Sequence, residues 1–320
     1  MRAGARESSL WLRFENPIVG KDAISRIRGR RSVVALTAYL LMLGGFGYAV
    51  YAISSDSGQF GRPPSGQIGG QVFSAMAIFQ VVLIALFVPA LTAGAISGER
   101  ERQTLDMLLV SRVSDWRIVW GKLVASIAYA LLLLAVSLPL FAGVFLFGGI
   151  DFGQFALTFL ITAATALALG AISLLFSAAF SRSLGSTVAS YGASFAYMGL
   201  TGVLGLIVTA IQSAQGGPAP GGPSFQANPF LLVNPVFGLA SVLFQGIGTT
   251  FTPASLFGAI LFQHPRVVGL ASSSGPTLEV WQITVATELI LVAVCLVAAV
   301  RILRRARSPR RSRASRGRSR

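Results

Sequence analysis

Charged residues are scarce in this chain of 320 residues, and so are the two side chains that most often bind transition metals. Asp, Glu, Lys and Arg together make up 12% of the sequence, whereas a soluble domain typically contains about 25%. Cys295 is the single cysteine and His264 the single histidine. A disulfide within the chain is therefore impossible, and a metal site built from several histidines or cysteines is excluded.

Long stretches lack charge altogether. No charged residue occurs in 123–150, 152–181 or 183–265, and 53% of all residues are hydrophobic. A helix that crosses a bilayer needs about 20 apolar residues, and several runs of this length do not fit a soluble protein. We predict an all-α integral membrane protein whose membrane domain, 33–302, contains six transmembrane helices. The expected spans are about 33–53, 72–96, 118–147, 152–180, 186–211 and 281–302.

The net charge of +15 is concentrated in four segments. Of 26 Lys and Arg residues, 8 precede residue 32, 5 lie from Arg100 to Lys122, Arg182 follows, and 10 lie from Arg301 onwards. Basic segments beside spans face the cytoplasm, and six crossings place all four there. We expect a multi-pass protein of the cell membrane with both termini cytoplasmic. The Arg/Ser-rich tail, 303–320, is predicted to be disordered and to contact anionic lipid rather than nucleic acid.

Two regions outside the spans also carry apolar residues. In the N-terminal segment 1–32, apolar residues from Ile18 to Ile27 can share one helix face, which favours an amphipathic helix on the cytoplasmic membrane surface; a solvated basic arm is the alternative. Residues 230–262 are apolar but interrupted by proline and glycine. We interpret 212–280 as an outer loop with re-entrant helices, and two further short spans are the alternative.

The charged segment 97–117, between the second and third spans, has the pattern of a short helix. Ser97 is the expected N-cap, and Glu99 and Glu101 fall in the first turn, where the helix dipole favours acids. The leucines that share one face farther on are Leu105, Leu108 and Leu109. Such an amphipathic helix either packs on its own membrane domain or docks on a partner, and periodicity does not distinguish the two.

The stretch from Gly94 to Lys122 closely resembles a signature of ABC transporter permeases of the type-2, exporter-like group. That signature comprises a Gly-Glu-Arg-Glu-Arg run, a Thr-Leu-acidic-Leu-Leu run, a Ser-x-Trp turn and a Gly-Lys pair. This chain supplies them at Gly98–Arg102, Thr104–Leu109, Ser114 with Trp116, and Gly121 with Lys122. Arg117 departs from the pattern, because the family often has an acid after the tryptophan.

The resemblance implies a six-span half of a dimeric transporter, homo- or heterodimeric, whose segment 97–112 is a cytoplasmic coupling helix for a separate ABC ATPase subunit. The residues that would dock on the ATPase are Glu99, Arg100, Glu101, Arg102, Thr104, Leu105, Leu108 and Leu109. The chain has no Gly-x-x-x-x-Gly-Lys-Ser/Thr run to cradle nucleotide phosphates. ATP and Mg²⁺ would therefore bind to the partner, and we expect neither a cofactor nor enzymatic activity in this chain.

Two polar residues lie deep in predicted spans. Glu288 is seven residues from Trp281 in the last span, and Gln80 is in the second. A charge at the bilayer centre costs about 2.5–3.5 kcal/mol on insertion scales, so such residues usually face the protein interior. Glu288 is either a substrate or proton contact or a hydrogen-bonded carboxyl near the outer interface. Gln80 has the same two interpretations, with hydrogen bonding between helices as the simpler one.

The function that these features favour is that of the permease subunit of an ATP-driven exporter. A membrane scaffold or assembly factor with the same fold is one alternative. An ion-driven secondary transporter, with Glu288 as the coupling acid, is the other. The sequence contains no pattern that identifies a substrate.

Overall fold

The computed structural model describes residues 30–56, 65–103, 115–214, 229–244 and 280–316, and every regular element within these ranges is helical. Six of these helices are long and apolar enough to cross a membrane. They are Val33–Ser55, Gly66–Glu101, Trp116–Phe145, Phe152–Ala179, Ser183–Val208 and Val280–Arg305. The predicted all-α integral membrane fold with six transmembrane helices is thus confirmed.

The membrane helices follow one another along the chain in six segments. The first four membrane helices are α3 (Arg30–Asp56), α4 (Ser65–Thr92), α7 (Asp115–Phe145) and α8 (Phe152–Ala179). The fifth runs through α9 (Ser183–Phe195), the π-helical turn η1 (Ala196–Leu200) and α10 (Thr201–Ala214), and the sixth is α14 (Val280–Arg316). Three short helices are α5 (Ser97–Glu101), α11 (Pro229–Val233) and α12 (Pro235–Leu243).

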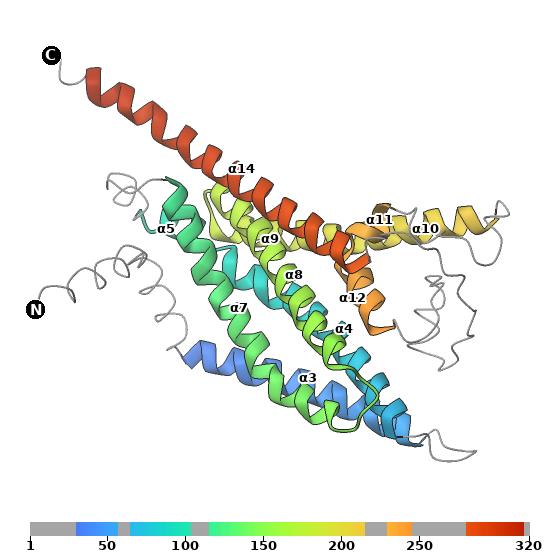
Figure 1. Cartoon of the computed structure of the whole chain (residues 1–320). Coiled ribbons are helices and arrows are strands. Elements are labelled where there is room, and N and C mark those ends of the chain that lie inside the picture. The colour runs from blue at the N-terminus through green and yellow to red at the C-terminus, as the bar shows by residue number, and fades with distance from the viewer. Residues whose placement is uncertain (1–29, 57–64, 104–114, 215–228, 245–279, 317–320) are drawn as a thin grey trace, which may run out of the picture.

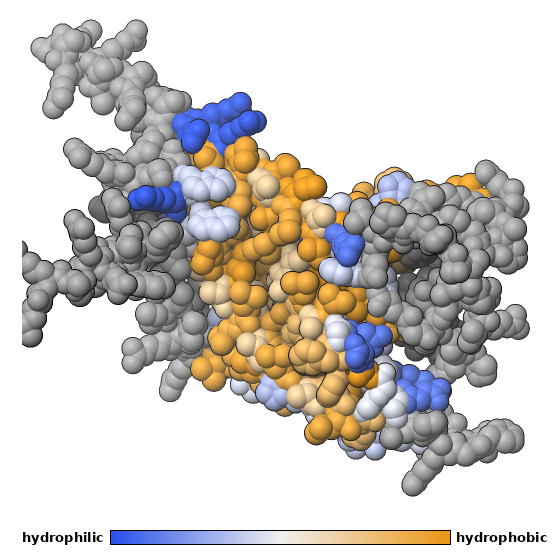
Figure 2. All heavy atoms as spheres, viewed as in Figure 1, coloured by the Kyte–Doolittle hydropathy of each residue, from blue (hydrophilic) through white to orange (hydrophobic). Residues whose placement is uncertain are grey.

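Helix α8 lies at the centre of the bundle (Figure 1). It packs against α4, α7, α9, α12 and, along much of its length, α14, while α3 packs on α4 and α7. The side chains of Ile161, Leu169 and Leu174 are accordingly fully buried. On the face shown in Figure 2, apolar residues cover the middle and hydrophilic residues lie towards its upper-left and right-hand ends, which is the polarity of a bilayer-spanning bundle.

A row of buried hydroxyl groups runs along α8. Thr158, Thr162, Thr165 and Ser173 are spaced three, four or eight residues apart, and each donates a hydrogen bond to the carbonyl four residues earlier, at 2.7–3.0 Å. Bonding back to its own helix satisfies a hydroxyl donor where water is absent. The lone pairs of these oxygens then remain available to groups on neighbouring helices.

The turn between α7 and α8 is built from glycine and an acid. Gly148 and Gly149 have φ angles of +81° and +84°, a conformation that glycine adopts without steric cost. Asp151 then caps α8, because its Oδ2 accepts from the N–H of Gly153 at 2.9 Å, and Gln154 completes a capping box. The two glycines lie directly against the start of α4.

The short helices α11 and α12 meet at Asn234, next to the π-helical turn of the fifth span. The Asn234 amide donates to the Met198 carbonyl at 2.7 Å and to the Thr201 hydroxyl at 2.9 Å, and its oxygen caps α12 by accepting from Val236 N–H. Neither helix is long enough to cross a bilayer. The predicted re-entrant region continues beyond residue 244, outside the described residues, so the choice between re-entrant helices and extra spans stays open.

The C-terminal helix differs from its prediction. Helix α14 continues from the membrane segment to Arg316, so the prediction of disorder from residue 303 is wrong for 303–316. An arginine-rich segment extends a helix readily once the preceding turns have nucleated it, because arginine has a high helix propensity. The predicted N-terminal amphipathic helix lies outside the described residues.

Candidate functional site

The charged motif begins where the second membrane helix ends. Helix α4 stops at Thr92, and after a turn at 93–96 the five-residue helix α5 starts at Ser97. Ile96 and Ser97 are fully buried. A helix of five residues is far too short to be stable by itself in water, so contacts with its neighbours must hold α5 in place.

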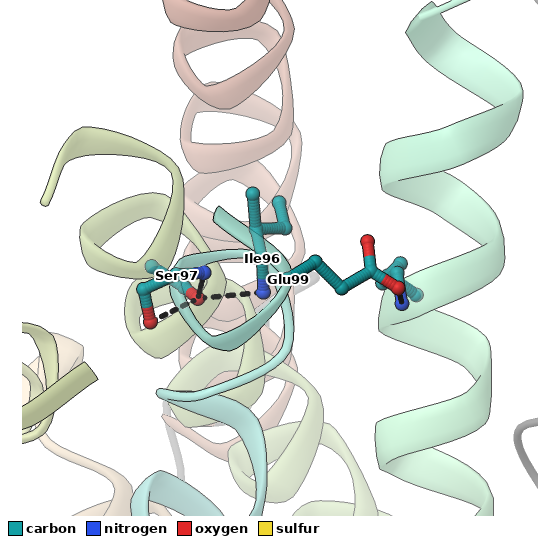
Figure 3. A network of polar contacts seen from close by, with 5 residues as sticks. Ile96, Ser97 and Glu99 are labelled. Atoms are coloured by element: carbon teal, nitrogen blue, oxygen red, sulfur yellow. Dashed lines mark hydrogen bonds and ion pairs between the residues drawn. The ribbon is translucent and has the colours of Figure 1, made fainter. Parts of the chain in front are cut away.

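Ser177, near the end of α8, holds the start of α5. Its Oγ accepts hydrogen bonds from the backbone N–H groups of Ile96 at 2.9 Å and Ser97 at 3.0 Å, as Figure 3 shows. The first N–H groups of a helix have no partner within that helix. A hydroxyl from another membrane helix therefore does what an N-cap side chain usually does.

Ser97 itself is not the N-cap that the sequence predicted. The N-cap position is Ile96, and no side chain of α5 caps the helix. The Ser97 hydroxyl instead donates to the Ala93 carbonyl at 2.9 Å and lies 3.3 Å from Ser177 Oγ. The prediction failed because the residue is buried against α8, where its oxygen meets a partner 80 positions away in the sequence.

Glu99 connects α5 to the third span. Lys122 on α7 donates a hydrogen bond to Glu99 Oε1 and forms an ion pair with it. In Figure 3 the Glu99 side chain extends away from Ser97 towards the neighbouring helix. The Lys122 side chain is 5% exposed and that of Glu99 24%. Breaking a buried pair by removing one partner typically costs about 3–5 kcal/mol, because the other charge stays out of water.

Arg100 connects α5 to the end of the fourth span. Its guanidinium donates to the carbonyl oxygens of Ala178 and Phe180, each at 3.1 Å. These carbonyls belong to the last turn and C-cap of α8. A cation favours this position because the final carbonyls of a helix lack intrahelical partners and carry the negative end of its dipole.

Glu101 connects α5 to the start of the fifth span. One carboxylate oxygen accepts from the Ser183 backbone N–H at 2.9 Å and the other from the Ser183 hydroxyl at 2.6 Å. The N-cap residue of α9, Arg182, makes no capping bond with its own side chain. Glu101 thus supplies the negative charge that the N-terminus of α9 favours.

Together these contacts form a clasp, by which we mean Ile96–Glu101 with Ser177, Lys122, Ser183 and the last carbonyls of α8. It ties helix α5 to one end of α7, α8 and α9. Arg102 and Gln103 follow as exposed residues, and a φ of +58° at Gln103 ends the helical path. The predicted docking residues Thr104, Leu105, Leu108 and Leu109 lie outside the described residues.

The two intramembrane polar residues lie at different helix contacts. Gln80 is fully buried, and its Nε2 donates to Ser137 Oγ at 2.8 Å and Tyr39 OH at 3.2 Å, which connects α4 to α7 and α3. This is the hydrogen bonding between helices that the sequence offered as the simpler interpretation. Glu288, also fully buried, bonds to Thr165 of α8.

Sequence reasoning missed the three side chains outside α5 that bond to it in the clasp. Ser177 and Ser183 belong to an uncharged apolar stretch, and Lys122 had entered only as part of the Gly-Lys pair. The spacing of Thr165, Ser173 and Ser177 could have predicted a polar face on the fourth span. Nothing in the spacing indicated which helix that face would meet.

The described part of the chain contains no group of three or more His, Cys, Asp or Glu side chains placed to hold a metal ion. The arrangement at the clasp consists of charge-assisted and neutral hydrogen bonds, without an activated nucleophile or an acid and base that converge on open space. These bonds connect a short, partly exposed helix to three membrane helices and fix its position.

Comparison with known proteins agrees with a protein that crosses the membrane several times. No curated protein matches the chain. Residues 16–305, most of its length, match the family described as ABC-2 family transporter protein, and the matched region includes all six membrane helices and the clasp. The chain is therefore a multi-pass membrane protein that belongs to the ABC-2 transporter family.

Proposed function

We propose that this protein is the membrane-spanning permease subunit of an ATP-driven exporter and that a separate ABC ATPase subunit powers it. The observation that carries the proposal is the clasp, because α5 is bonded to three spans at once. A force applied to α5 acts on the ends of α7, α8 and α9 together. Several of these links are charge-assisted hydrogen bonds, which are shorter and stronger than neutral ones.

The docking face of α5 comprises the exposed residues at its end. Glu101, Arg102 and Gln103 are exposed, and Thr104, Leu105, Leu108 and Leu109 continue the motif. Glu99 and Arg100 have a different role, because their side chains hold α5 against α7 and α8. ATP and Mg²⁺ bind to the ATPase, and its closure moves α5.

The distribution of charged and exposed apolar side chains indicates the contacts with lipid and with a second permease subunit. By the positive-inside rule, we expect α5 and both termini to face the cytoplasm, where the arginine-rich end of α14 would contact anionic lipid. Helices α3 and α9–α10 leave large apolar side chains exposed, including Leu41, Val188 and Val203. These sides face lipid or the second permease subunit of a homo- or heterodimer.

The test is co-expression with candidate ABC ATPases, followed by purification and reconstitution in liposomes. Arg102→Gln removes an exposed charge from the docking face, and we expect ATPase affinity to fall about five-fold, which corresponds to roughly 1 kcal/mol. Arg301→Gln is the matched control, because it removes an exposed arginine from the cytoplasmic end of α14. It should leave affinity unchanged.

Glu99→Gln separates docking from coupling. This variant removes the carboxylate from the Lys122 ammonium but leaves the exposed end of α5 intact. We expect it to bind the ATPase and to lose most of the permease-dependent stimulation of ATP hydrolysis. A complex insensitive to both Arg102→Gln and Glu99→Gln would contradict the docking site, and ATP hydrolysis that never drives export of any substrate would favour a scaffold.

A further inference from the structure

Glu288 occupies the contact between α14 and α8, in the interior of the membrane domain. Its side chain is fully buried, and Oε1 lies 2.8 Å from Thr165 Oγ1. The second oxygen, Oε2, is closed off from solvent and has no hydrogen-bond partner among the described residues. A buried polar atom without a partner is uncommon, and each one requires a physical explanation.

No opposite charge among the described residues faces this carboxyl. The elements that pack on α14 are α7, α8, α11 and α12. Helices α8, α11 and α12 contain no ionisable residue, and α7 carries its charged residues within 115–122. Lys122 is paired near Ser177, which is 12 residues and therefore about 18 Å along α8 from Thr165.

Among the described residues, the other titratable groups on these elements are uncharged. Tyr197 of η1 lies close to Glu288, and its hydroxyl donates to the Val233 carbonyl at 2.9 Å. Cys295 lies two turns farther along α14, and Tyr129 lies on α7. None of the three supplies a positive charge. An ionised carboxylate here would be buried and uncompensated, which costs several kcal/mol in a dry interior.

The hydrogen bonds of Thr165 also argue against an ionised Glu288 carboxylate. Its Oγ1 lies within hydrogen-bond distance of two oxygens, the Ile161 carbonyl at 3.0 Å and Glu288 Oε1 at 2.8 Å, but a hydroxyl has one hydrogen. Thr158, Thr162 and Ser173 on the same helix donate to the carbonyl four residues earlier. If Thr165 does likewise, the hydrogen between Thr165 and Glu288 comes from a protonated carboxyl.

We propose that Glu288 is a proton-binding site inside the membrane domain. The carboxyl binds one proton when α8 and α14 are packed together, and its O–H donates to Thr165 Oγ1. A proton needs no space beside Oε2, whereas a metal or an organic cation would have to separate the two helices. The proton stabilises the contact, because it removes the charge that would otherwise draw water into it.

The surroundings of the site allow the contact to change. Beside it lie the π-helical turn Ala196–Leu200 and the break between α11 and α12 at Asn234, and Thr284, one turn before Glu288, donates to the Leu232 carbonyl at 2.9 Å. Single π-turns are frequent at functional sites, and interrupted helices line the ion sites of membrane transporters. Separation of α14 from α8 would hydrate the carboxyl and release its proton.

The test is infrared spectroscopy of the purified full-length chain in a detergent that contains no ester or carboxyl group. A protonated carboxyl has a C=O stretching band well separated from carboxylate bands, and the chain contains only 11 acidic residues. At neutral pH we expect this band in the wild type and its loss in Glu288→Gln. The control is Asp151→Asn, which removes an exposed carboxyl and keeps a good N-cap, so the band should remain.

If Glu288→Gln does not fold, Thr165→Val tests whether the protonated carboxyl is that of Glu288. This variant removes the hydroxyl that accepts the hydrogen bond from the carboxyl, so the band should persist and shift to the higher frequency of a carboxyl without a hydrogen bond. A wild-type spectrum without the band, a band that survives in Glu288→Gln, or a band unshifted in Thr165→Val would each overturn the proposal. The experiment needs no ATPase, so its outcome is independent of the proposed transport function.

Discussion

At the scale of single residues, the hydroxyl of Ser177 has the most concentrated role in the clasp. One oxygen accepts from two backbone N–H groups at the start of α5, in a buried position. Leaving a buried donor unsatisfied costs about 1–3 kcal/mol, more than the net gain from forming an ordinary hydrogen bond. The stability of α5 therefore depends on a side chain from a different helix.

We expect Ser177→Ala to loosen α5. It should lower the free energy of unfolding by about 1–3 kcal/mol, because two donors lose their acceptor, and it should speed amide hydrogen exchange at residues 96–101. Thermal unfolding in detergent and exchange mass spectrometry measure the two effects. Ser173→Ala is the matched control one turn earlier, because Ser173 Oγ donates only to its own helix, at Leu169. Equal effects of both variants would contradict the role of Ser177.

At the scale of elements, close packing and capping by neighbours substitute for intrinsic helix propensity. Helix α5 has five residues, and α4 begins with Ser65, Gly66, Gly69 and Gly70, all poor or indifferent helix formers. The start of α4 is held by the turn between α7 and α8. A Cβ atom built on Gly69 would lie 2.4 Å from the Gly148 carbonyl oxygen, so backbone meets backbone there.

Substitutions at two neighbouring glycines of α4 test this contact. Gly69→Ala should destabilise the protein by about 1–3 kcal/mol, because the backbone of the turn between α7 and α8 must move. At Gly70 the nearest atom, the Gly149 carbonyl oxygen, would lie at 3.6 Å, an ordinary contact. Gly70→Ala should therefore be neutral, or stabilising by up to about 1 kcal/mol through helix propensity. Thermal unfolding compares them, and equal losses would argue against a tight contact.

At the scale of the whole molecule, the distribution of charge distinguishes the two ends of the bundle. The clasp, the start of α7 and the end of α14 lie at the same end of the bundle (Figure 1), and they carry basic residues. The turn between α7 and α8 and the start of α4 lie at the other end. The positive-inside rule predicts that the end with the clasp faces the cytoplasm.

Cysteine labelling checks this orientation on a nearly clean background, because Cys295 is the single native cysteine and is 5% exposed. We expect Gln67→Cys, exposed at the start of α4, to react with a membrane-impermeant maleimide in intact cells. Arg102→Cys, exposed at the end of α5, should react only after permeabilisation. The reverse pattern would invert the topology and place α5 out of reach of a cytoplasmic ATPase.

Much of the fold could be predicted because its signals are local. The apolar stretch 152–180 coincides with α8 to within a residue, since Asp151 and Arg182 bound it on either side. Helix α4 begins at Ser65, whereas the span was predicted to begin at about residue 72. The first two turns were missed because they are rich in glycine, which does not indicate a helix. The helical continuation to Arg316 was missed because an arginine- and serine-rich composition alone indicates disorder.

The sequence by itself determined the class of protein: charge-free runs fixed the number of membrane helices, and the motif from Gly98 to Lys122 indicated the family. Only the tertiary structure decided which motif side chains face inward. Glu99, Arg100 and Glu101 each bond to a different membrane helix, and their partners Ala178 and Ser183 are 78 and 82 positions away. Hydrophobicity and helical periodicity are properties of neighbouring residues, whereas a hydrogen bond between distant helices depends on how those helices pack.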